Sequence, residues 1–262
     1  GPARAAPRAG AAGVATSTRF RIRFGKSRDM RFISHLDLMR TWERTLRRSG
    51  LPLAFTQGHH PHLRMSFGPP LPLGYRSRAE AFDLELERPP GVDLAERLNA
   101  VLPEGLRVLD FRPILFKTPS LMSQLEGASY RVRFPRGFLD TAGIPPERLL
   151  AELDARVAAL LARDVVVVRR RSEDQAREFD ARPSIAAMLA HAGEPPAVLD
   201  LHVRFTLRAA ARPDDLVGLL FPGSDPRTVD VERTELWAER GGERLDPLRL
   251  LSPRTEEAPP RP

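Results

Sequence analysis

The chain has 262 residues, of which 42% are hydrophobic, so it can bury a sizeable core and suits one large domain or two ordinary ones. Its formal net charge is +7 and it contains no cysteine, which excludes a disulfide framework, a Cys-ligated iron-sulfur cluster and a cysteine nucleophile. No apolar run approaches the roughly 20 residues of a membrane span and no secretory signal opens the chain, so we expect a cytoplasmic protein without a membrane partner.

Positive charge is concentrated near the N-terminus. Residues 19–80 contain 13 Arg and Lys against four Asp and Glu, a segment charge of +9. Because Arg4 and Arg8 add two more positive charges to a chain total of +7, residues 81–262 must carry −4. This polarisation predicts a basic surface for a polyanion in the first part of the chain.

The residue pattern predicts α+β architecture between disordered tails at 1–18 and 252–262. In the first half we expect a strand at 20–24 with Arg21 and Arg23 facing outward, then a helix from Ser34 to Gly50. Further elements are expected as strands at 51–56, 81–87 and 106–114 and a helix at 93–102. This order is βαββαβ.

The second half repeats the order more loosely. The expected strands are 130–134, 165–171, 198–207 and 228–237, and the expected helices are 146–163 and 213–221. Each half has the size of a ferredoxin-like unit with an antiparallel sheet. We therefore predict two tandem ferredoxin-like units, a basic one at 19–117 and a second at 128–240, with a single large mixed α+β domain as the alternative.

The predicted helix after Ser34 carries a stripe of arginines. Leu38, Trp42 and Leu46 fall on one face, and the opposite face bears positive charge. Guanidinium groups along one helix face can follow a phosphate backbone, whereas most charged helix faces are only solvated. We predict RNA binding by this stripe and the cations around it: Arg21, Arg23, Lys26, Arg40, Arg44, Arg47, Arg48 and Arg64.

Histidines suggest two further kinds of site. His59, His60 and His62 share one loop, but without cysteine the set is incomplete for a metal, so we predict no metal. His35 in the first turn of the helix would be mostly neutral, and with Lys26 or a nearby Arg it could cleave RNA by general acid-base catalysis. The alternative, which we favour, is a structural hydrogen-bonding role for His35.

Other motifs indicate no nucleotide cofactor. The stretch from Pro69 to Arg78 has too few glycines to cradle a phosphate, and no G-x-G-x-x-G or G-x-x-x-x-G-K string occurs. Asp180 and Arg182 either fix a turn or belong to a site, and we favour the turn. No cofactor is predicted.

Several strings stand out within residues 19–207: Phe32-Ile33-Ser34-His35-Leu36-Asp37-Leu38-Met39-Arg40, Arg48-Ser49-Gly50-Leu51-Pro52, Gly58-x-x-Pro61-His62, Leu71-Pro72-Leu73-Gly74, Ser77-x-x-Glu80 and Asp180-x-Arg182-Pro183. They closely resemble the radical SAM-linked family of unknown function, whose members occur alone or fused to the C-terminus of cobalamin-type radical SAM proteins. The resemblance implies an auxiliary role beside a radical SAM enzyme. The family usually reads Gly-aromatic-Asn-Pro-His-Pro where this chain has His59, His60 and Leu63.

The paired βαββαβ architecture and a His near the first helix are also distantly similar to CRISPR-repeat endoribonucleases. Their glycine-rich loop in the second unit has no counterpart here. We therefore expect a radical SAM-associated auxiliary module that binds structured RNA and presents it to the partner enzyme in trans, with Ser34, His35, Asp37 and His62 as a polar site. An endoribonuclease using His35 and a protein adaptor are the alternatives.

Overall fold

The structure is a computed structural model that describes residues 17–171, 176–193, 196–206 and 210–250. Most residues of the two predicted tails lie outside these ranges, although Thr18 already opens the first strand. The first half contains β1 (Thr18–Lys26), η1 (Arg28–Phe32), α1 (His35–Ser49), β2 (Met65–Phe67), β3 (Arg76–Leu86), α2 (Leu94–Asn99), β4 (Leu106–Ile114) and the connecting α3 (Leu121–Gln124).

The second half begins with β5 (Gly127–Arg133), α4 (Arg136–Ala142), η2 (Pro146–Arg148) and α5 (Leu149–Leu161). It continues with β6 (Val167–Arg171), β7 (Ala176–Asp180), η3 (Arg182–Ser184), β8 (Ile185–Ala192), β9 (Ala197–Arg204), α6 (Pro213–Leu220), η4 (Pro226–Thr228), β10 (Asp230–Arg240), β11 (Glu243–Leu245) and η5 (Pro247–Arg249). Within the described residues, no helix combines the length and the apolar composition that crossing a bilayer requires.

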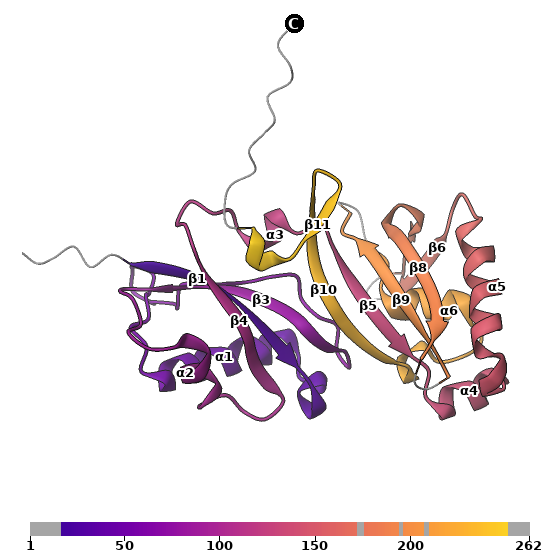
Figure 1. Ribbon diagram of the computed structural model, residues 1–262, viewed down its shortest axis with the longest axis horizontal. Helices are drawn as coiled ribbons and strands as arrows, with labels where there is room; N and C mark the ends of the chain where they lie inside the picture. The colour runs from indigo at the N-terminus through magenta and orange to yellow at the C-terminus, as the bar shows by residue number, and fades with distance from the viewer. Residues whose placement is uncertain (1–16, 172–175, 194–195, 207–209, 251–262) are drawn as a thin grey trace, which may run out of the picture.

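One sheet runs through both halves (Figure 1). Among the described residues it has nine strands, in the order β4-β1-β3-β10-β5-β9-β8, with β2 paired to β3 and β11 to β10. Neighbouring strands are antiparallel except at the junction of the halves, where β3 and β10 pair in parallel through Arg76 with Glu232 and Ser77 with Arg233. The predicted α+β class with a mostly antiparallel sheet is confirmed.

Two hydrophobic cores fill the space between this sheet and its helices. In the first half, Phe24 on β1 and Phe82 on β3 pack edge-on or tilted against Trp42 of α1. The second core lies beneath α4, α5 and α6 and also takes in Leu71 and Tyr75 from the loop before β3. That loop therefore belongs to the first half by sequence and to the second half by packing.

The predicted strand at 51–56 is wrong. These residues make only isolated bridges, Leu53 with Leu86 and Phe55 with Leu63, and the strand paired with β3 is β2. Pro52 has no backbone N–H to donate to a ladder. The edge of β3 from Phe82 to Leu84 is already taken by β2.

The strand predicted at 165–171 forms as β6, but it is not part of the main sheet. It pairs with β7 in a separate hairpin, and the strand beside β9 in the main sheet is β8. Strand β8 was not predicted because its sequence, Ile-Ala-Ala-Met-Leu-Ala-His-Ala, contains four alanines, which have low strand propensity.

Candidate functional site

Helix α1 begins and ends as its sequence predicts. The Ser34 hydroxyl accepts the Asp37 N–H at 3.1 Å and donates to the Asp37 carboxylate at 2.7 Å. This bond, together with the nearby charge of Arg40, holds the pKa of Asp37 below its usual value. Gly50 closes the helix with a φ of 71°, a left-handed conformation that glycine adopts without a steric penalty.

The arginine stripe of α1 points to solvent, opposite the buried Leu38, Trp42 and Leu46. We call Arg40, Arg44, Arg47 and Arg48, all exposed, the arginine face. Two of these arginines make contacts within α1: Arg40 forms an ion pair of 3.3 Å with Asp37, and Arg44 donates to the Thr41 hydroxyl at 3.2 Å. The other two contact neighbouring segments: Arg48 donates to the Val101 carbonyl at 3.1 Å, and the Arg47 guanidinium lies 5.4 Å from the Phe55 ring.

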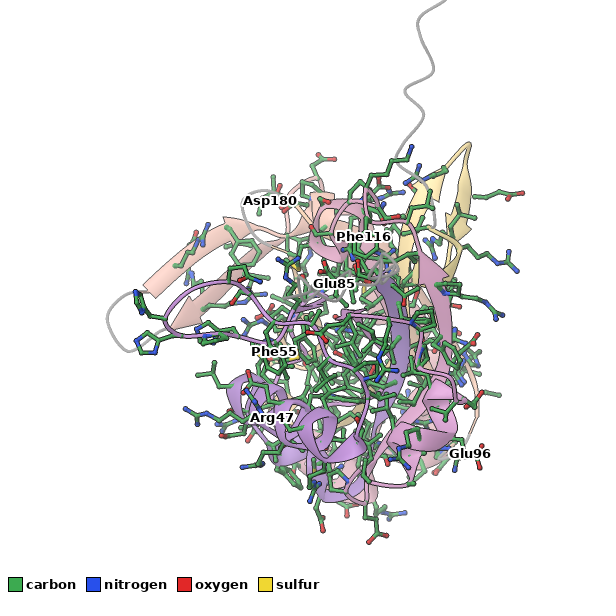
Figure 2. All side chains as sticks on the ribbon, turned by 90° about the vertical axis from the view of Figure 1, so that its left-hand side faces the viewer. Arg47, Phe55, Glu85, Glu96, Phe116 and Asp180 are labelled. Carbon is green, nitrogen blue, oxygen red and sulfur yellow. The ribbon has the colours of Figure 1, made fainter. Side chains whose placement is uncertain are left out.

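Figure 2 shows Arg47 next to Phe55 on the side of the sheet that α1 covers. Apart from Asp37, no carboxylate is found in an ion pair with this face among the described residues. The charge of the arginine face is therefore available to an external anion.

The predicted RNA-binding cations on β1 differ from the arginine face, because other parts of the protein cover or pair with them. Arg21 was expected to face outward, but it is fully buried and binds both oxygens of Asp83, at 2.8 and 3.0 Å. Its guanidinium also donates to the carbonyl oxygens of Pro247 and Leu250. The expectation failed because α3 and the C-terminal η5 segment cover the face of β1 that lies opposite the first core.

Three more predicted phosphate ligands are engaged by the protein itself. Arg23 pairs with Asp246, the residue before η5, at 2.6 Å, so this carboxylate partly neutralises it. Lys26 is buried and donates to the Ile33 carbonyl at 3.3 Å. Arg64 is exposed but pairs with Glu85 at 3.0 Å. The predicted cations are thus separated, and only the arginine face remains open as a group.

A buried polar cluster lies beside the first residue of α1. Glu80 on β3 accepts a hydrogen bond of 2.9 Å from Arg233 on β10, and both side chains are buried. Arg233 also donates to the Tyr130 hydroxyl at 3.2 Å. Further bonds, of 2.9 and 3.1 Å, reach the carbonyl oxygens of Pro69 and Pro70. We call Lys26, His35, Glu80, Tyr130 and Arg233 the junction cluster.

Burial sets the protonation of the junction cluster. It lowers the pKa of Lys26, against the opposing charge of Glu80. It also lowers the pKa of His35, where Glu80 again opposes the shift and Lys26 adds to it. Burial disfavours the charge on Arg233 too, but Glu80 and Tyr130 outweigh it and hold the pKa of Arg233 above its usual value. His35 is therefore favoured in its neutral form, which can accept a proton.

The remaining motif residues around the cluster shape the backbone. The Ser77 hydroxyl accepts the Ala79 N–H at 3.1 Å and lies 3.4 Å from the Arg233 carbonyl. Gly74 has a φ of 85°, and its N–H donates to the Arg31 carbonyl at 2.8 Å, which holds the loop before β3 against η1.

The structure does not gather the predicted polar site. Ser34, His35 and Asp37 open α1, whereas Pro61 and His62 lie in an exposed loop that begins at Phe55. Phe55 packs on Arg47, 12 residues along the helix from His35, a rise of about 18 Å. Within the described residues, no group of three His, Asp or Glu side chains could hold a metal ion.

Asp180 fixes a turn, as we favoured from the sequence. Its exposed carboxylate accepts the N–H groups of Val166 and Arg182, both at 2.9 Å, and these bonds lower the pKa of Asp180. The guanidinium of Arg182 lies 3.4 Å from the Leu161 carbonyl. These two residues stabilise the β6–β7 hairpin against α5.

A protein family described as "uncharacterized protein conserved in bacteria (DUF2344)" has a model that matches residues 19–213. The chain belongs to this family. Its matched region starts in β1 and ends at the first residue of α6, so it includes Lys26, His35 and Glu80 but not Arg233. No protein of curated function matches the chain.

Two site residues, Arg233 and Tyr130, are not among those predicted from the sequence. The signal for Arg233 is its position in β10, because it falls two residues after the buried Val231 and thus on the apolar side of the strand. A charged residue at such a position needs a buried partner of opposite charge. Which partner it meets depends on the β3–β10 pairing, which no local pattern reveals.

Proposed function

We propose that this chain is an RNA-binding auxiliary protein that presents RNA to a radical SAM enzyme acting in trans. The observation that carries the RNA-binding part is the arginine face of α1, four exposed guanidinium groups whose only ion-pair partner among the described residues is Asp37. Each such group can bind a phosphate and release a counterion.

The surface beside the arginine face supports RNA with unpaired bases. Phe32 and Leu36 are 58% and 63% exposed, and the Arg31 guanidinium lies over the Phe32 ring at 4.6 Å. Exposed aromatic rings next to cations are typical of proteins that stack unpaired bases. A hairpin RNA could place its backbone on the arginine face and a loop base on Phe32.

Binding of a labelled RNA hairpin and of total bacterial RNA, measured at graded salt concentrations, tests this proposal. Changing Arg40, Arg44, Arg47 and Arg48 together to Gln should weaken binding and reduce the slope of log K against log salt by up to about 3, since each phosphate contact contributes about 0.7 to 0.9. Gln keeps the helix propensity of Arg.

The control variant changes Arg88, Arg136, Arg148 and Arg163, four exposed arginines scattered elsewhere, to Gln. It removes the same charge and should leave the salt slope near that of the wild type. Equal losses in both variants, or binding that ignores salt, would contradict the proposal.

The radical SAM partner is supported by the motif resemblance and by the lack of cysteine, because this polypeptide cannot itself ligate an iron-sulfur cluster through thiolates. Crosslinking in cells separates the roles: nucleotide adducts on α1 favour RNA binding, and adducts to protein alone favour an adaptor.

A second candidate function, metal-independent RNA cleavage, is favoured by one observation. His35 lies near Lys26 and Glu80, and burial lowers the pKa of both His35 and Lys26, which suits a general base and a general acid. Cleavage of the bound RNA in the presence of EDTA, absent in His35→Ala, supports this function. Intact RNA after incubation with the wild-type protein rejects it.

We also infer that each half is one ferredoxin-like unit. The first half has the strand order β4-β1-β3-β2, and the second has β10-β5-β9-β8. Numbered within each half, both orders are 4-1-3-2, the order of that fold, with the β6–β7 hairpin as an insertion. The shared strand order supports treating the two halves as repeats of one structural unit.

A further inference from the structure

A cavity of about 890 Å³ lies in the second half, between the β6–β7 hairpin, the start of α6 and η4. Arginine is its most frequent lining residue. The five are Arg169, Arg170, Arg177, Arg212 and Arg227. Three acids, Glu178, Asp214 and Asp215, also line it, so the lining carries a net charge of +2.

The acids of the cavity are already engaged. Asp215 forms an ion pair with Arg170 and accepts the Arg212 N–H at 2.7 Å. Asp214 accepts the hydroxyl of Tyr75 at 2.8 Å. Glu178 accepts a bond of 2.6 Å from Nε of Arg169. All three carboxylates therefore already accept hydrogen bonds from the protein, and two of them, Asp215 and Glu178, also form ion pairs with arginines.

Three of the arginines, Arg169, Arg212 and Arg227, keep donors to spare. A guanidinium carries five N–H donors, and the bonds found for Arg169 use only its Nε. Arg227 is 83% exposed and binds Asp225 through Nε and Nη2. The exposed Arg212 side chain has no ion-pair partner among the described residues. The free N–H groups of these arginines form a set of donors for an anion.

We propose that this cavity binds the phosphate of a nucleotide, either free or at the end of an RNA strand. The guanidinium fork matches the oxygens of phosphate, and the volume lies within the roughly 300–1,000 Å³ of small-ligand sites. A nucleoside without phosphate has no negative charge that could pair with the surplus positive charge of the lining.

The position of the cavity connects it to the arginine face. Tyr75 both donates to the Asp214 carboxylate and accepts the Asp214 N–H at 3.1 Å, so the loop before β3 reaches the cavity wall. The residue before Tyr75, Gly74, donates its N–H to the Arg31 carbonyl and so holds the same end of that loop against η1, next to α1. Figure 2 shows α1 and the β6–β7 hairpin on the same side of the sheet. The RNA-end form of this proposal rests on the proposed function, whereas the free-nucleotide form does not.

Calorimetric titration of the full chain with adenosine, AMP and short single-stranded RNAs, each with a hydroxyl or a phosphate at the 5′ or 3′ end, tests the proposal. A phosphorylated ligand should bind at least about tenfold more tightly than its unphosphorylated counterpart. The double variant Arg212→Gln with Arg227→Gln should lose this preference, and Arg148→Gln should keep it.

The possible results are distinguishable. Preference for AMP over adenosine identifies a free nucleotide as the ligand, and preference confined to phosphorylated RNA identifies a strand end. If the arginine-face variant loses RNA affinity while the wild type shows no preference for phosphate, this inference is wrong and the proposed function stands. If AMP binding depends on Arg212 and Arg227 but no RNA binds, the free-nucleotide form of this inference stands and the proposed RNA-binding function is wrong.

Discussion

Arginine serves two opposite purposes at the level of single residues. Arg21 and Arg233 are buried, and each is bound to a carboxylate, Asp83 and Glu80 respectively. Arg44 and Arg47 on α1 are exposed, with no carboxylate partner among the described residues. The same side chain stabilises the fold in the first case and offers charge to a ligand in the second, and its place relative to the sheet decides which.

His191 gives a prediction of pH-dependent stability. Its Nε2 lies 2.9 Å from Asp200, and this bond raises the pKa of His191, with smaller help from the Ala192 carbonyl. A folded pKa above the unfolded value of about 6.5 adds stability that is fully present below pH 6.5 and is lost as pH rises through the folded pKa. His191→Gln should therefore lower the free energy of unfolding more at pH 5.5 than at pH 8.5.

Urea unfolding of the wild type and His191→Gln at both pH values measures this difference. In an Asp200→Asn background the effect of His191→Gln should no longer change with pH, because the carboxylate that favours the protonated ring is gone. If His191→Gln lowers the free energy of unfolding equally at both pH values while Asp200 is present, the pairing of protonated His191 with Asp200 adds no stability.

At the level of elements, the junction of β3 and β10 depends on side chains more than on backbone pairing. Only two residue pairs join these strands. Beside them, the Glu80–Arg233 ion pair connects β3, β10 and, through Tyr130, β5. The loop before β3 adds Leu71 and Tyr75 to the second core. Removing a single partner of the ion pair should therefore weaken the whole junction.

Glu80→Ala leaves Arg233 buried without its carboxylate, which costs about 3–5 kcal/mol in comparable buried pairs. We expect a loss of that order in the free energy of unfolding, measured in urea. Glu85→Ala, which removes the half-exposed partner of Arg64, is the control and should cost about 1 kcal/mol or less. Similar losses in both variants would mean that the buried pair has no special role at the junction.

At the scale of the whole molecule, the continuous sheet predicts that both halves unfold together. Besides the β3–β10 junction, the buried Arg21 of β1 binds carbonyl oxygens of Pro247 and Leu250, in and directly after η5 of the second half. Neither half can therefore unfold without exposing buried charge in the other. Cooperative unfolding is the expected result.

The two tryptophans report on this directly, because Trp42 lies in the first core and Trp237 on β10. In Trp237→Phe the remaining Trp42 reports on the first half, and in Trp42→Phe the remaining Trp237 reports on the second half. Within each variant, the urea transitions seen by fluorescence and by far-ultraviolet circular dichroism should coincide. A fluorescence transition of Trp42 at lower urea than the dichroism change would indicate that the first half unfolds independently.

Local chemistry in the sequence was enough to place α1. Ser34 as the cap, the spacing of Leu38, Trp42 and Leu46, and Gly50 at the end all act within a few residues, so the helix and its exposed arginine face could be predicted. The same reasoning located α2, α6 and β4. It failed at 51–56 and at β8, where the assignment depends on pairing with other segments that the local pattern does not specify.

Only the tertiary structure decided which cations face solvent and which are buried. Arg21 and Arg23 do point away from the first core as their alternation predicts, but α3 and η5 return from distant parts of the chain to cover that face. The junction cluster likewise needs Glu80 and Arg233, 153 residues apart, to meet across β3 and β10. Helix formation is a local equilibrium, whereas burial of a charge requires a partner that only the folded chain brings into contact.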